Sequence, residues 1–138
     1  MKLKDLLEGI SYELIQGDLE REITAVAYDS RKVEKGALFV CLKGFASDGH
    51  QYIGQAVQAG AAALPVEDVP SELPDAAVVR VADSRKALAA LSAAWFGYPA
   101  RRMTMIGLTG TKGKTTTAHM VKGILEAAGY KVGMIGTL

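Results

Sequence analysis

Apolar residues in the first hundred positions alternate between short continuous runs and helix-like spacing. Four apolar runs of strand length predict strands, at 24–28, 37–42, 61–66 and 77–81. Three segments with apolar residues three and four positions apart predict helices, at 3–8, at 51–59 and from Asp83 or Ser84 onward. Gly60 is placed to end the second of these helices. Strands that alternate with helices in this way predict an α/β fold.

The apolar stripe of the third predicted helix closes with Gly97-Tyr98-Pro99. Proline disfavours helical geometry in the residue before it, so we expect a domain boundary here, between 1–98 and 99–138. Beyond it the pattern predicts a strand, a helix and a second strand, at 103–108, 115–128 and 131–135. These three elements would form one βαβ unit.

Composition narrows the classes of function. The chain has 138 residues, is 49% hydrophobic and 22% charged, and has a net charge of +1, which provides no general attraction to nucleic acid or to an anionic membrane surface. No stretch approaches the 18 apolar residues of a membrane span, and the first residues do not fit a signal peptide. The single cysteine, Cys41, lies in an apolar run and is expected to be buried. We therefore expect a cytoplasmic protein in a reducing compartment.

The stretch 107–117 has the sequence G-L-T-G-T-K-G-K-T-T-T and lies between a predicted strand and a predicted helix. Glycines there allow backbone N–H groups to turn onto phosphate oxygens, and the following helix N-terminus favours the same negative charge. Lys114 is expected to reach the β- and γ-phosphates, and the Thr115 hydroxyl to help hold Mg²⁺. The strict phosphate-loop pattern requires glycine where this chain has Leu108. The alternative is a glycine-rich turn that only packs tightly.

Two side chains in and after that loop, those of Lys112 and His119, are less informative, although the Lys112 backbone N–H lies in the loop in either case. Lys112 is equally consistent with a position toward solvent and one toward phosphate, and His119 is expected to be a surface or packing residue because no cluster of ligands accompanies it.

Polar residues also gather near the ends of the early predicted strands, as Tyr28-Asp29-Ser30-Arg31, Lys43-Gly44 and Asp48-Gly49-His50. Such positions form pocket rims in α/β domains. Taken alone, the same residues are consistent with a turn closed by a local ion pair at 29–31 and with an Asx-type loop at His50.

The order of these motifs resembles the Mur ligases, the bacterial ATP-dependent amide ligases that build the stem peptide of peptidoglycan. The series is D-S-R, G-x-L-F-V-C-L-K-G, D-G-H, A-x-x-x-G-A-A-A and the glycine-rich loop, and it runs along nearly the whole chain. Within the family, the closing sequence at 133–137 favours the members that add the third stem-peptide residue.

The resemblance implies that residues 1–98 form a uridine-nucleotide-binding α/β domain in which Ser30 contacts the UDP-muramoyl substrate, with Tyr28 and the 43–50 loop as weaker candidates. It implies that 99–138 begin a phosphate-loop ATP domain. The residues implied to bind ATP are Gly110, Thr111, Lys112, Gly113, Lys114, Thr115 and Thr116, with Lys114 catalytic and Thr115 on Mg²⁺. The implied reaction forms an acyl phosphate on the D-Glu carboxylate of UDP-N-acetylmuramoyl-L-alanyl-D-glutamate. An amino acid then attacks it, meso-diaminopimelate by expectation and L-lysine as the alternative.

Members of the family have about three domains, so the resemblance implies that the rest of the central domain and the C-terminal domain are absent from this chain. We expect the 138 residues alone to be inactive, the intact protein to be a monomer, and the exposed strands after Pro99 to favour self-association. Three alternatives stay open: a non-catalytic UDP-sugar or nucleotide-binding module, the ligase that adds D-Ala-D-Ala, and folylpolyglutamate synthetase. The last is the poorest match, because its glycine loop lies near the N-terminus.

Overall fold

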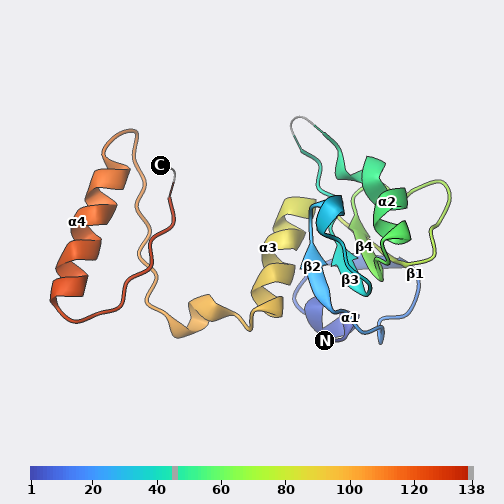
Figure 1. Ribbon diagram of the computed structural model, residues 1–138, viewed down its shortest axis with the longest axis horizontal. Coiled ribbons are helices and arrows are strands. Elements are labelled where there is room, and N and C mark those ends of the chain that lie inside the picture. Colours follow the sequence, from blue (N-terminus) through green and yellow to red (C-terminus); the bar gives the residue numbers. More distant parts are fainter. Residues whose placement is uncertain (45–46, 137–138) are drawn as a thin grey trace. The chain divides into compact units, whose positions relative to one another are not determined.

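The computed structural model describes residues 1–44 and 47–136, and the chain divides into two compact units, Met1–Pro99 and Ala100–Leu138 (Figure 1). The division lies next to Tyr98, whose φ of 54° is left-handed and unusual for a residue with a side chain. Part of the closing sequence at 133–137 and part of the 43–50 loop lie outside the described residues.

The first unit contains a five-stranded sheet with the order β1-β5-β4-β3-β2. The strands are β1 (Tyr12–Gln16), β2 (Ala25–Ala27), β3 (Ala37–Phe39), β4 (Ala63–Val66) and β5 (Ala77–Val81). Strands β2 to β5 are parallel and adjacent in chain order, whereas β1 pairs antiparallel with β5. The carboxyl ends of the four parallel strands therefore share one edge of the sheet, where open α/β sheets bind their ligands. We refer to it as the carboxyl edge.

Helices cover both faces of this sheet. Successive residues of a strand point to opposite faces, so Leu38 joins the core under α1 (Leu3–Leu6) and α3 (Ser84–Trp95), while Phe39 joins the core under α2 (Ile53–Gln58). Leu91 of α3 and Phe39 are 0% and 1% exposed. The result is the α/β fold expected from the sequence.

Most predicted elements of this unit are confirmed, with shifted ends. All four predicted strands form: β2, β3 and β4 are shorter than predicted, and β5 has its predicted length. The helix expected from residue 51 begins instead as a 3-10 turn, η2 (Gly49–Tyr52). Strand β1 has no counterpart among the predictions. Cys41 is buried as expected, and this desolvation raises the pKa of its thiol to about 12.

In the second unit only part of the prediction holds. The helix forms as α4 (Lys114–Ala127), after a short 3-10 turn η3 (Pro99–Arg102). The strands predicted at 103–108 and 131–135 are wrong, since neither segment is a strand, and the expected βαβ unit reduces to its helix. Parallel strands need backbone partners on a neighbouring strand, and Ile106 and Ile135 are instead exposed. Among the described residues no helix has the length and apolar character to cross a bilayer.

Candidate functional site

Ser30 lies at the carboxyl edge, directly after β2. Asp29 begins the 3-10 turn η1 (Ser30–Lys32), accepting a hydrogen bond from the Arg31 amide at 3.1 Å and pairing with the Arg31 guanidinium at 2.8 Å. These bonds, that of the Arg31 side chain above all, lower the pKa of Asp29 to about 2. The half-buried Ser30 hydroxyl donates to Gln55 Oε1 of α2 at 3.1 Å. The local ion pair considered as an alternative is therefore present, and it leaves Ser30 at the surface of the edge.

The same tripeptide, Asp-Ser-Arg, recurs at 83–85 after β5. Asp83 is the N-cap of α3 and accepts from the amides of Arg85 and Lys86, each at 3.0 Å. Here, however, the serine is fully buried, and both its amide and its hydroxyl donate to Glu67 Oε1 at 2.7 Å. The amide and hydroxyl of Ser84 thus have their hydrogen-bond acceptor within the protein.

Lys43, after β3, is joined to the same group. Its amide donates to Ser84 Oγ at 3.4 Å, and its ammonium lies 3.6 Å from Glu67 Oε2 and 2.5 Å from Asp68 Oδ2. The Ser84 hydroxyl and amide, followed by Lys43, lower the pKa of Glu67. Lys43 is therefore paired with carboxylates of its own chain.

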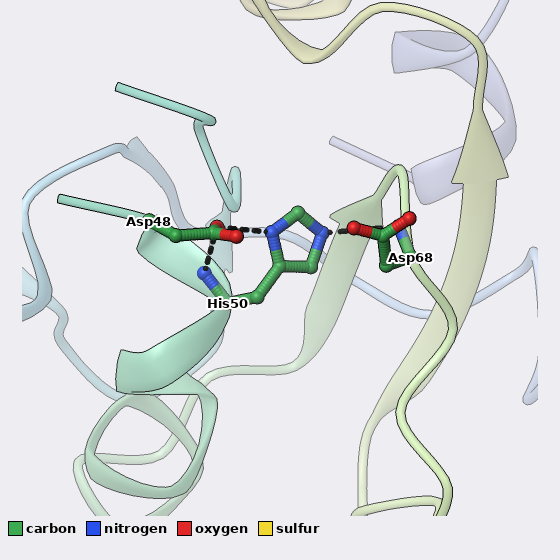
Figure 2. Close-up of side chains that lie close together, drawn as sticks. All are labelled: Asp48, His50 and Asp68. Atoms are coloured by element: carbon green, nitrogen blue, oxygen red, sulfur yellow. Dashed lines mark hydrogen bonds and ion pairs between the residues drawn. The ribbon is translucent and has the colours of Figure 1, made fainter. Parts of the chain in front are cut away.

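His50 lies between Asp48 and Asp68, as Figure 2 shows. Its Nδ1 is 2.6 Å from Asp48 Oδ1, and its Nε2 accepts from the backbone amides of Glu67 at 3.0 Å and Asp68 at 3.2 Å. An Nε2 that accepts places the proton on Nδ1, which donates to Asp48. Ligand atoms of these three side chains lie within 4.8 Å of one another, a spacing compatible with a metal ion. Both ring nitrogens already have partners, so the arrangement instead ties two loops together.

An open cleft of about 570 Å³ lies beside this group, at the ends of β4 and β5 and the start of β1. Its charged residues are largely paired: Lys43 with Glu67 and Asp68, and Arg80 with Glu13. Because the cations are neutralised by these carboxylates, the cleft lacks the surplus positive charge that a diphosphate requires.

The glycine-rich loop lies in the second unit, and all of residues 110–116 are exposed. Gly113, the N-cap of α4, has a φ of 76°, and no side chain caps the amides of the first helical turn. The Lys114 ammonium donates to the Gly110 carbonyl within the loop. Uncapped amides at a helix N-terminus, beside a lysine, are suited to phosphate oxygens, and the hydroxyls of the exposed Thr115 and Thr116 are of the kind that ligates Mg²⁺. His119 is exposed and its Nδ1 contacts the Thr115 carbonyl at 2.8 Å, in keeping with a surface role.

The predicted site residues thus fall into two groups. Ser30, Tyr28 and the described part of the 43–50 loop belong to the first unit, and Gly110, Thr111, Lys112, Gly113, Lys114, Thr115 and Thr116 belong to the second. Sequence reasoning missed Glu67, Gln55 and the interior role of Ser84. Glu67 had a usable signal, since it is the first polar residue after the apolar run of β4.

Similarity to known proteins shows the family of the chain. The model of the family described as "Mur ligase family, catalytic domain" matches residues 22–96, more than half of the chain. The chain is 49% identical over all 138 residues to UDP-N-acetylmuramoyl-L-alanyl-D-glutamate–2,6-diaminopimelate ligase 1 of Clostridium acetobutylicum and 48% identical to the corresponding ligase of Clostridium perfringens. It spans 29% and 28% of those two proteins.

Solved structures give the same family. A crystal structure of MurF from Acinetobacter baumannii matches with a TM-score of 0.71 and 31% identity, over 91% of this chain and 27% of that one. The MurF ligase of Thermotoga maritima, solved in complex with ADP, matches with a TM-score of 0.55 and 29% identity, over 81% and 25%. On the strength of the family match, and of a fold and motif order that agree with it, the chain belongs to the Mur ligase family.

Proposed function

We propose that this chain is the substrate-binding and ATP-binding part of a ligase that joins 2,6-diaminopimelate to UDP-N-acetylmuramoyl-L-alanyl-D-glutamate. The observation that carries the proposal is the 49% identity to a ligase of that name along all 138 residues, which includes both the Ser30 region and the glycine-rich loop. Because the chain spans 29% of that relative, the complete reaction is proposed for a protein of the relatives' length that contains this segment.

The first unit is proposed to bind the uridine-nucleotide substrate at the carboxyl edge. Ser30 supplies a surface hydroxyl there, whereas the buried Ser84 of the matching tripeptide is engaged by Glu67. The exposed side chain of Tyr28 and the described flanks of the 43–50 loop lie next to the same strand ends. A site at this position follows the general rule for open α/β sheets.

The second unit is proposed to bind ATP through residues 110–116. Backbone amides of the loop would donate to phosphate oxygens, the Thr115 hydroxyl would ligate Mg²⁺, and the Lys114 ammonium would move from the Gly110 carbonyl to the phosphates. A carboxylate is a poor electrophile at neutral pH. In the first step the γ-phosphoryl group of ATP would pass to the D-Glu carboxylate of the substrate, giving an acyl phosphate and ADP. In the second step the amine of diaminopimelate would attack the acyl carbon, lose a proton and release inorganic phosphate. Lys114 would neutralise charge during the phosphoryl transfer.

The ligase that adds D-alanyl-D-alanine is the second candidate, because solved structures of that enzyme share this fold. Their 31% identity is well below the 49% of the diaminopimelate ligase, which favours the latter.

Separate titrations of the chain test the proposal. Calorimetric titration with UDP-N-acetylmuramoyl-L-alanyl-D-glutamate should show binding that Ser30→Ala weakens and Lys114→Ala leaves unchanged. Titration with Mg·ATP should show binding that Lys114→Ala weakens and Ser30→Ala leaves unchanged. If the uridine substrate binds equally well to unaltered chain and to Ser30→Ala, the assignment of Ser30 is wrong, and a chain that binds neither ligand would refute the proposal.

A further inference from the structure

Glu67 connects four segments at the carboxyl edge. Its Oε1 accepts from the amide and the hydroxyl of Ser84 at the start of α3, and its Oε2 faces the Lys43 ammonium after β3 at 3.6 Å. Its own amide donates to His50 Nε2 in η2 at 3.0 Å. One residue of the β4–β5 connection therefore holds the start of a helix and both flanks of the loop that follows β3.

The burial of Ser84 makes its hydrogen bond to Glu67 costly to lose. Ser84 is 0% exposed, and its hydroxyl donates to Glu67 while its oxygen accepts the Lys43 amide at 3.4 Å. A buried hydroxyl that loses its acceptor is left unsatisfied at a cost of about 1–3 kcal/mol. Ser84 and Glu67 are therefore expected to keep these partners throughout the native state.

The flanks held in this way are Lys43–Gly44 and Ser47–His50. Lys43 and Asp48 form an antiparallel bridge, the Gly44 amide donates to the Ser47 carbonyl at 3.0 Å, and the Gly49 amide donates to the Leu42 carbonyl at 2.7 Å. Glu67 reaches one flank through the Lys43 ammonium and the other through His50. The two flanks are thus fixed relative to each other and relative to the ends of β3, β4 and β5.

We propose that Glu67 and Ser84 are positioning residues of the uridine-substrate site. Neither contacts the substrate, and together they hold the flanks of the 43–50 loop in the geometry that binds it. The inference rests on the proposed function, because that function places the substrate against these flanks. Small displacements of binding groups weaken binding strongly, so loss of the connection should lower affinity even in a protein that stays folded.

The test uses Glu67→Gln, which keeps the size of the side chain and an oxygen that can accept from Ser84 but removes the charge that faces Lys43. Glu20→Gln is the matched control, since Glu20 is also a glutamate paired with lysine, here Lys2 and Lys4, but it lies before β2, away from the carboxyl edge. Each variant of the 138-residue chain is titrated with UDP-N-acetylmuramoyl-L-alanyl-D-glutamate, and its melting temperature and the amide hydrogen exchange of Gly44 and Gly49 are measured.

We expect Glu67→Gln to raise the Kd about tenfold, to speed exchange at Gly44, which follows Lys43, more than at Gly49, and to leave a cooperative melt. The backbone amide of Glu67 still donates to His50 on the Gly49 side, and Glu20→Gln should leave the Kd and the exchange unchanged. Ser84→Ala should weaken binding in the same direction. A lower melting temperature with an unchanged Kd in Glu67→Gln would show a purely structural role and overturn the inference alone. If the unaltered chain does not bind the substrate, the proposed function falls and this inference falls with it.

Discussion

Leu91 allows a direct test of whether the first unit carries its own stability. This residue of α3 is 0% exposed and packs in the core that α3 and α1 form over the sheet. Replacing a buried leucine with alanine removes apolar contacts and leaves a cavity, at a cost of about 2–5 kcal/mol. Since Leu91 lies among buried neighbours on both helices and the sheet, we expect Leu91→Ala to lower the free energy of unfolding by about 3 kcal/mol. For a unit of this size, that corresponds to a fall in melting temperature of roughly 12–24 °C.

Urea titration followed by tryptophan fluorescence measures this loss in one unit. Trp95, the sole tryptophan of the sequence, is partly buried against the same core, so its emission reports on the first unit. Ile124→Ala is the matched control: it also shortens an aliphatic side chain on a helix, but Ile124 of α4 is 68% exposed, and its change should stay within about 0.5 kcal/mol. If Leu91→Ala shifts the transition by less than about 1 kcal/mol, or if both variants shift it equally, the first unit does not have the independent core described.

Four further measurements follow from single residues. Asp83→Ala removes the N-cap of α3 and should cost roughly 0.5–2 kcal/mol in a urea titration, with no loss if the cap is dispensable. The pKa of Glu67 is lowered from its ordinary 4.5, so its contribution is present above that pH and lost as pH falls through the folded value; acid titration of stability should be less steep in Glu67→Gln. Cys41, with its thiol pKa raised to about 12, should react with a disulfide reagent only after denaturation, and fast labelling of the native protein would contradict its burial. Gly113→Ala forces a side chain into a left-handed position, so it should weaken Mg·ATP binding while leaving the Trp95 transition unchanged.

Helices were more predictable than strands, for a physical reason. Backbone hydrogen bonds of α3 and α4 form within a few residues, so apolar spacing and an N-cap such as Asp83 suffice to locate a helix. A strand depends on a partner far away in the sequence. Strand β1 exists because Tyr12 pairs with Val81, and nothing near residue 12 signals that pairing. Conversely, the segments 103–108 and 131–135 have strand-like composition but no pairing within the described chain.

The site residues that could be predicted from the sequence are likewise those whose roles depend on residues close to them in the chain. The glycine-rich loop could be predicted because the chemistry is local: a left-handed Gly113, a lysine and a helix N-terminus follow one another in the chain. Glu67 could be noticed as the first polar residue after the apolar run of β4, but the roles of Glu67 and Ser84 could not be predicted. Those roles depend on contacts between residues 17 positions apart and, with Lys43, 41 positions apart. A residue type and its neighbours in sequence do not indicate such contacts.

The repeated tripeptide Asp-Ser-Arg shows which features depend on neighbours in sequence and which depend on the surrounding fold. In both copies, Asp29 and Asp83, the aspartate caps the turn that follows it, because that hydrogen bond spans only two residues. The serines differ, because Ser84 is buried beside the β4–β5 connection while Ser30 is half-buried at the carboxyl edge. A tripeptide therefore predicts the turn, and the surroundings of its serine decide between a structural hydroxyl and one available to a ligand. Ser84→Ala should therefore lower the melting temperature more than Ser30→Ala, because the Ser84 hydroxyl makes part-buried hydrogen bonds with Glu67 and Lys43, whereas the Ser30 hydroxyl makes an exposed one with Gln55.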